Sequence, residues 1–168
     1  ADGHVFKEHF EKIESLMKHG VGLALLHYAL EFKEGKEAET ANRGIGGRYA
    51  RHWSVNPVWT AEFKNFSDHP ITRGLKPFAI EDEWYYNMRF VDGMEGVTPV
   101  LTAVPPDETR DGPDGMHSGN ATVRANKGRP EHLAWARVRP DGGRGFGFTG
   151  GHWHANWADD NFRRLRSE

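Results

Sequence analysis

The sequence contains no cysteine in its 168 residues. A chain without cysteine cannot form a disulfide, bind zinc through thiolates or use a thiolate as a nucleophile. It also has no apolar run long enough to span a bilayer, and its formal net charge is only -2. This charge gives no electrostatic reason for binding nucleic acid or an anionic membrane, so we expect neither as a partner. Any chemistry must therefore come from other groups, above all histidines and carboxylates.

The glycine-rich segments lack the context of a nucleotide-binding loop. Residues 44–47 (Gly-Ile-Gly-Gly) do not follow a buried strand, and no Gly-Lys-Ser/Thr sequence occurs. Residues 142–145 (Gly-Gly-Arg-Gly) fall in a predicted hairpin. Neither segment opens a helix, whose N-terminus would bind the phosphates, and we expect no nucleotide site here.

Large apolar side chains are abundant, with 37% hydrophobic and 12% aromatic residues. A disordered chain would contain far fewer, and this length suffices for one buried core. We therefore expect a single domain over residues 1–168. The segment Ala1-Asp2-Gly3 resembles the interior of a longer chain, and we expect further residues upstream of it.

Hydrophobic periodicity predicts an α/β fold. Apolar residues recur at helical spacing over 6–17, and Gly20 is expected to end this helix. The continuous apolar run 21–26 is typical of a strand buried on both faces in a parallel sheet. Residues 107–129, rich in glycine and polar residues, are predicted to form a long surface loop. Further elements are strands at 58–63, from Phe78 to Ile80 and at 98–104, a hairpin of 132–138 with 144–148, and a helix at 159–165.

Polar side chains follow three of the predicted strands. His27 ends the most apolar strand, residues 81–83 (Glu-Asp-Glu) follow another, and His152 and His154 follow the last. Ligands in open α/β sheets bind beyond the carboxyl ends of strands, where histidine and carboxylate together suit acid–base chemistry. Period-two geometry directs Asp82 away from its two neighbours, and at least one of the three carboxylates is expected to be solvated. The alternative for His27 is a buried histidine bonded to a carbonyl.

A divalent metal is the one cofactor that the sequence suggests. His152 and His154 share a side if the strand continues, and His52 would supply a third ligand. The alternative for His52 is simple packing beside Trp53.

The chain has six tryptophans, and several of them adjoin the polar groups. Rings beside carboxylates and histidines suit sugars, whose C–H faces stack while their hydroxyls form hydrogen bonds. A tryptophan-rich core is the alternative, because tryptophan is highly buried on average. The expected substrate-contacting residues are Tyr28, Trp84, Tyr86, Trp153 and His154.

Five short motifs follow one another along nearly the whole chain. They are 22–27 (Gly-Leu-Ala-Leu-Leu-His), 46–49 (Gly-Gly-Arg-Tyr) with His52, 69–75 (His-Pro-Ile-Thr-Arg-Gly-Leu), 82–85 (Asp-Glu-Trp-Tyr) and 145–152 (Gly-Phe-Gly-Phe-Thr-Gly-Gly-His). This ordered set resembles the ThuA-like (trehalose utilisation) family. The similarity is greatest to bacterial members found beside sugar oxidoreductases.

This resemblance implies a flavodoxin-like sheet with helices on both faces, as in class I glutamine amidotransferases, and here with a C-terminal β-hairpin. His27 and Tyr28 stand where an amidotransferase has its nucleophilic cysteine, so glutamine hydrolysis is not expected. The family's first β/α units have no counterpart in residues 1–168, which we expect to be N-terminally incomplete. The polar positions carried over by resemblance are His27, His52, Glu83 and His152.

The resemblance also implies a role in carbohydrate catabolism. We expect an enzyme that acts on trehalose-type disaccharides or their 3-keto derivatives by isomerisation or glycoside cleavage. Glu83 and His152 are the expected acid and base, and His27 is expected to orient or polarise a carbonyl or hydroxyl. The alternatives are a non-catalytic sugar-binding or assembly module that works with a sugar oxidoreductase, and a metal-dependent hydrolase. A homo-oligomer is a further alternative to assembly with a sugar oxidoreductase. The expected compartment is the cytoplasm or the periplasm of a bacterium.

Overall fold

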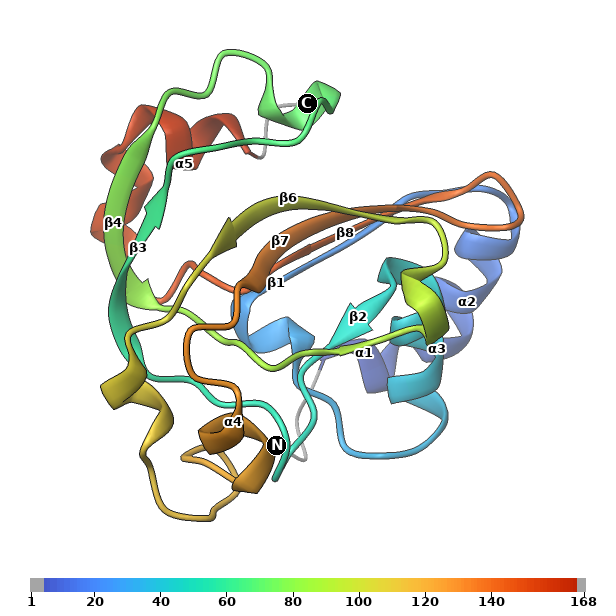
Figure 1. Cartoon of the computed structure of the whole chain (residues 1–168). Helices are drawn as coiled ribbons and strands as arrows, with labels where there is room; N and C mark the ends of the chain where they lie inside the picture. Colours follow the sequence, from blue (N-terminus) through green and yellow to red (C-terminus); the bar gives the residue numbers. More distant parts are fainter. Residues whose placement is uncertain (1–4, 166–168) are drawn as a thin grey trace.

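A four-stranded mixed sheet crosses the centre of the molecule in the computed structural model, which describes residues 5–165 (Figure 1). The expectation about residues upstream of Ala1 lies outside this range. The edge strand β1 runs parallel to β8, whereas β8 with β7 and β7 with β6 are antiparallel. In spatial order the strands are β1 (Leu23–Leu26), β8 (Arg144–Phe148), β7 (Glu131–Val138) and β6 (Val97–Ala103).

Two smaller antiparallel pairs accompany this sheet. The hairpin of β3 (Val58–Phe63) and β4 (Phe78–Glu83) curves over one face, and β2 (Gly47–Arg48) pairs with β5 (Arg89–Phe90). Apolar and polar residues alternate along β3, and its buried side chains face the hydrophobic core. The strand predicted at 58–63 is therefore confirmed.

Helices lie on both faces of the central sheet. On one face α1 (Val5–Glu8), α2 (Phe10–Lys18) and α3 (Lys36–Ile45) enclose a core around Trp135. On the other face α5 (Asp160–Arg164) and the β3–β4 hairpin enclose a second core around Trp84 (Figure 1). The predicted α/β class is confirmed, and the arrangement is consistent with a flavodoxin-like fold. The remaining helices are α4 (Ala121–Ala125) and the short 3₁₀ helices η1 (His27–Leu30), η2 (Pro70–Thr72), η3 (Asp92–Met94), η4 (Asp107–Arg110) and η5 (His154–Ala158).

Glycines in β8 allow α3 to pack closely on the sheet. Side chains alternate across a strand, so Phe146 and Phe148 face the second core while Gly145 and Gly147 face the first. A Cβ atom on Gly145 would lie 2.3 Å from the carbonyl oxygen of Gly44 in α3. This close approach of two backbones requires a residue without a side chain.

Replacing Gly145 by alanine is expected to destabilise the protein by about 1–3 kcal/mol, because the added methyl group must push α3 from the sheet. Gly22 provides a matched control, since a Cβ there would lie 3.6 Å from its nearest atom, which is an ordinary contact. Denaturant unfolding of Gly145→Ala and Gly22→Ala measures both effects. Equal stability of the two variants would show that the close packing of α3 on β8 is not needed.

Three details of the sequence-based fold prediction need correction. Strand β1 is not buried on both faces: it lies at the edge of the sheet and only Leu25 is fully buried. The helix predicted over 6–17 is two helices separated at His9, whose backbone is not helical. The segment 107–129 is not a simple loop, because it contains η4 and α4.

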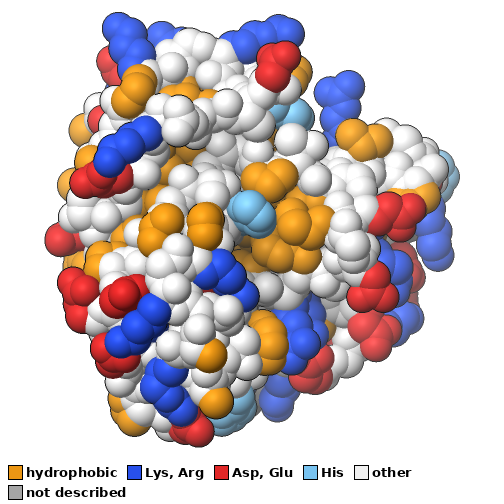
Figure 2. All heavy atoms as spheres, viewed as in Figure 1, with side chains coloured by type: hydrophobic (Ala, Val, Ile, Leu, Met, Phe, Trp, Pro, Cys, Tyr) orange, Lys and Arg blue, Asp and Glu red, His pale blue; other side chains and the backbone are white. Residues whose placement is uncertain are grey.

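Figure 2 shows hydrophobic side chains gathered near the middle of the face seen in Figure 1, with lysine, arginine and acidic side chains interspersed around them. None of the described helices is long and apolar enough to cross a membrane.

Candidate active site

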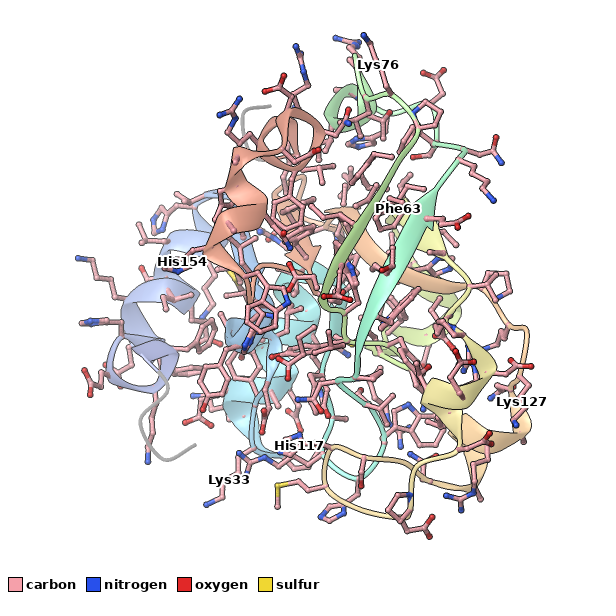
Figure 3. All side chains as sticks on the ribbon, turned by 90° about the vertical axis from the view of Figure 1, so that its left-hand side faces the viewer. Lys33, Phe63, Lys76, His117, Lys127 and His154 are labelled. Atoms are coloured by element: carbon pink, nitrogen blue, oxygen red, sulfur yellow. The ribbon has the colours of Figure 1, made fainter. Side chains whose placement is uncertain are left out.

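Two histidines and a glutamate from separate elements meet at one end of the central sheet. His27 follows β1, Glu83 ends β4, and His152 follows β8. Glu83 Oε2 lies 3.2 Å from His27 Nε2 and 3.3 Å from His152 Nδ1, and the two ring nitrogens are 3.3 Å apart. Figure 3 shows this end of β4 between the labelled residues His154 and His117. We call His27, Glu83 and His152 the His–Glu–His cluster.

The backbone of His27 turns sharply between β1 and η1. Its φ angle is 48°, which lies in the left-handed region that residues with a side chain rarely adopt. A strained residue at a strand-to-helix turn projects its side chain over the end of the sheet, as the nucleophile does in hydrolases with a nucleophile elbow. The backbone at His27 therefore resembles the turn that carries the nucleophile in such hydrolases.

A hydrogen bond determines which nitrogen of His27 faces the cluster. Nδ1 lies 2.9 Å from the carbonyl oxygen of Thr149, and a carbonyl can only accept. Nδ1 therefore carries a proton, so in the neutral ring Nε2 presents a lone pair to Glu83 and His152.

Glu83 is oriented by a residue from the loop before β3. Asn56 donates a hydrogen bond of 3.0 Å from Nδ2 to Oε1 of Glu83, which leaves Oε2 facing the two histidines. The side chain of Glu83 is mostly buried, and an uncompensated buried carboxylate is costly. The Asn56 amide supplies one donor that the carboxylate needs, and a proton on Nδ1 of His152 would supply another.

Asp82 fixes the segment that carries His152. Its side chain is fully buried and points to the opposite side of β4 from Glu83. Oδ1 accepts hydrogen bonds from the backbone nitrogens of Glu83 (2.8 Å) and His152 (2.9 Å). Oδ2 accepts from the backbone nitrogen of Gly151 and from Asn156 Nδ2, both at 2.9 Å. The Asp82 carboxylate therefore fixes the position of His152 relative to Glu83.

Two buried tyrosines extend the site. The hydroxyl of Tyr85 lies 3.1 Å from His27 Nε2, and that of Tyr49 lies 3.0 Å from His117 Nδ1. The two tyrosine rings are 5.1 Å apart and edge-on. Burial raises the pKa of both hydroxyls well above the ordinary value, and the negative charge of Glu83 raises both further. Both tyrosines therefore remain neutral hydrogen-bonding groups at physiological pH.

The raised pKa of Tyr49 predicts a loss of stability in alkaline solution. Folding favours the protonated hydroxyl, so its contribution is fully present below the unfolded pKa of about 10 and is lost as pH rises beyond that value. The slope for this group is at most about 1.4 kcal/mol per pH unit. Denaturant unfolding between about pH 9 and 11 should therefore give a flatter profile for Tyr49→Phe than for the unmodified protein. Parallel profiles would contradict this assignment.

Of the predicted catalytic residues, the structure brings together His27, Glu83 and His152 but not His52. The His52 ring is exposed, and its backbone is bonded to the 111–120 segment instead. His154 is also exposed and begins η5. Within residues 5–165, the three groups positioned to share a metal ion are those of the His–Glu–His cluster, so the predicted ligand set of His52, His152 and His154 is corrected.

The predicted substrate-contacting aromatics divide into two groups. Trp84 and Tyr86 are 0% exposed and belong to the core, so neither can stack on a ligand, and this part of the prediction is corrected. Trp153 is 43% and Tyr28 47% exposed. Each is the chain neighbour of a cluster histidine, and the Trp153 ring packs edge-on against His152.

Sequence reasoning missed the groups that orient the cluster. Asn56 and His117 lie in segments with no distinctive pattern, and Tyr49 ends the 46–49 motif but was not among the predicted site residues. The role of Asp82 had a signal, because strand alternation places it on the buried side of β4, where a carboxylate needs several donors. As expected, one of the three acidic neighbours, Glu81, is exposed.

Fold and site together define an α/β protein with a cluster of two histidines and one carboxylate at strand ends, where no cysteine nucleophile is present. The trehalose utilisation (ThuA) family matches residues 1–167, and the chain belongs to this family. Membership of this family implies a role in trehalose utilisation, within carbohydrate metabolism. No curated protein and no solved structure matches the chain.

Proposed function

We propose that this protein is an enzyme that acts on trehalose-type disaccharides, and specifically on their 3-keto derivatives, by proton transfer at the His–Glu–His cluster. The observation that carries the proposal is the convergence of His27, Glu83 and His152 within 3.3 Å from three strand ends. Three ionisable side chains placed together at the carboxyl ends of strands are typical of a reaction centre.

A ketone at C3 makes the chemistry accessible to these groups. The ketone acidifies the C–H bond at C2, so a carboxylate can remove that proton and leave an enolate. Reprotonation of the enolate gives isomerisation. Alternatively, the electron pair forms a C1–C2 double bond while the C1–O bond breaks, and the departing sugar oxygen takes a proton from an acid.

The cluster offers a group for each step. Glu83 is the proton acceptor, and His152, which is 44% exposed and 3.3 Å from Glu83, is the acid that meets the leaving oxygen. The hydroxyl of Tyr85 and the His27 ring lie 3.1 Å apart beside Glu83, where a donor can stabilise the enolate oxygen. The exposed rings of Tyr28 and Trp153 suit the C–H faces of the two sugar units.

The same chemistry implies the reaction that supplies the substrate. A 3-keto sugar forms by oxidation of a secondary hydroxyl, which this cluster has no means of performing alone. We therefore expect a sugar oxidoreductase to act before this protein, with the sugar itself as the small-molecule partner.

Incubation with 3-keto-trehalose in D2O, followed by proton NMR, tests the proposal. Exchange of the C2 proton for deuterium reports proton removal even when no net product forms, and trehalose itself is the control that should not exchange. Absence of both exchange and product, with and without added divalent metal, would overturn the proposal. Sugar binding without exchange would instead indicate the non-catalytic sugar-binding module.

A further inference from the structure

The three inward atoms of the His–Glu–His cluster form a nearly equilateral triangle. Its edges are 3.2 Å from His27 Nε2 to Glu83 Oε2, 3.3 Å from Glu83 Oε2 to His152 Nδ1, and 3.3 Å between the two nitrogens. All three atoms are potential ligands, and each belongs to a different part of the chain.

Protons cannot bridge all three edges of this triangle. A ring nitrogen either donates or accepts, so at most two of the three edges can hold a linear hydrogen bond. With His27 Nε2 unprotonated, that nitrogen accepts from the Tyr85 hydroxyl at 3.1 Å, and only His152 Nδ1 is left to donate to Glu83. A cation at the centre of the triangle would bind all three atoms at once.

We propose that His27 Nε2, Glu83 Oε2 and His152 Nδ1 bind one divalent cation, with Zn²⁺ as the best match. Zinc bonds to histidine nitrogen and carboxylate oxygen are about 2.0–2.1 Å long, and a tetrahedral ion then separates its ligands by about 3.3–3.4 Å. The observed edges of 3.2–3.3 Å match this spacing. Two histidine nitrogens and one carboxylate oxygen also favour zinc over magnesium or calcium, which prefer oxygen ligands.

The hydrogen bonds around the triangle are those that metal ligands use. A ligating histidine usually donates its other ring N–H to a carbonyl or carboxylate, which fixes its tautomer. His27 does so through Nδ1 to the Thr149 carbonyl at 2.9 Å. Asn56 holds the outer oxygen of Glu83 at 3.0 Å, so that Oε2 is left for the ion. These hydrogen bonds orient the ligand atoms of His27 and Glu83 toward the centre of the triangle.

The site is open on one side. The side chains of His27 and Glu83 are 15% and 19% exposed, whereas His152 is 44% exposed. Three protein ligands with a fourth position facing solvent are typical of a catalytic rather than a structural zinc site. This inference rests on the residues of the proposed function and deepens it: the ion would polarise the sugar ketone. Glu83, bound to the ion through Oε2, would keep Oε1 to accept the C2 proton, and His152, bound through Nδ1, would keep Nε2 as the donor to the leaving oxygen.

Metal titration tests the site independently of any reaction. The full chain, produced without a histidine tag and treated with a chelator, is titrated with Zn²⁺ in a calorimeter and with Co²⁺ in a spectrophotometer. We expect one equivalent of each to bind, and the Co²⁺ protein to show the intense visible bands of four-coordinate cobalt. Asn56→Ala should weaken Zn²⁺ binding about 10- to 100-fold, and His152→Ala and Glu83→Gln by more than this.

His154→Ala is the matched control, because it removes an exposed histidine two residues from His152 and outside the cluster. It should leave Zn²⁺ affinity unchanged. Failure of the parent chain to bind Zn²⁺, or equal affinity in His152→Ala and His154→Ala, would overturn the metal site. A protein that binds zinc but does not exchange the C2 proton keeps the metal site and loses the proposed function. A protein that exchanges the C2 proton without binding zinc keeps the proposed function and loses the metal site.

Discussion

Replacing Glu83 by glutamine is expected to reduce exchange of the C2 proton of 3-keto-trehalose by about 100- to 10,000-fold. Glutamine keeps the size of the side chain and the oxygen that accepts from Asn56, so the fold should remain. It removes the charge that faces His27 and His152. Initial exchange rates at equal protein concentration, with circular dichroism to confirm folding, measure this effect.

Glu81 offers the control for this experiment. It lies on the same strand, two residues earlier, and its side chain is exposed. Glu81→Gln removes the same charge from β4 and should leave the rate within about twofold, because exposed charges interact weakly across solvent. If both variants lose activity equally, the effect belongs to the overall charge and not to the cluster.

Replacing Asp82 by alanine is expected to lower the free energy of unfolding by about 3–5 kcal/mol. The change leaves four hydrogen-bond donors without their acceptor, and three of them are backbone N–H groups at the cluster. For a chain of this size the loss corresponds to about 10 °C in Tm. Thermal unfolding followed by circular dichroism measures it.

The effect of Asp82 on the site can be separated from its effect on stability. Asp82→Asn keeps the shape of the side chain, but its amide nitrogen must face donors, so the segment of His152 should move. At a temperature where this variant is folded, Zn²⁺ affinity should fall. Glu81→Ala, on the exposed side of the same strand, should change the free energy of unfolding by no more than about 0.5 kcal/mol. A Tm for Asp82→Ala equal to that of Glu81→Ala would refute the anchoring role.

Many of the helices and strands could be predicted because the spacing of apolar residues over a short segment depends on the local secondary structure. The alternation in β3 and the turn between β7 and β8 each depend on neighbours in sequence, and both predictions are confirmed. The position of β1 at the sheet edge could not be predicted in this way. A short apolar run is compatible with a central or an edge strand, and strand order depends on contacts between distant segments.

The site was predictable as a list of polar residues at strand ends but not as a geometry. His27, Glu83 and His152 could be selected because each follows an apolar strand. The same reasoning also selected Trp84 and Tyr86, which are buried. Adjacent residues in a strand point to opposite sides, and the sequence does not say which side faces the ligand.

The absence of cysteine is a property of the sequence alone, and it excludes thiolate chemistry whatever fold the chain adopts. The motif order likewise indicated the ThuA family, because the order of motifs along the chain can be read without the tertiary structure. Only the tertiary structure determined that His52 and His154 lie outside the cluster and that three ligand atoms stand 3.2–3.3 Å apart. Distances of this kind depend on how β1, β4 and β8 converge and on the single buried carboxylate of Asp82, so no local pattern records them.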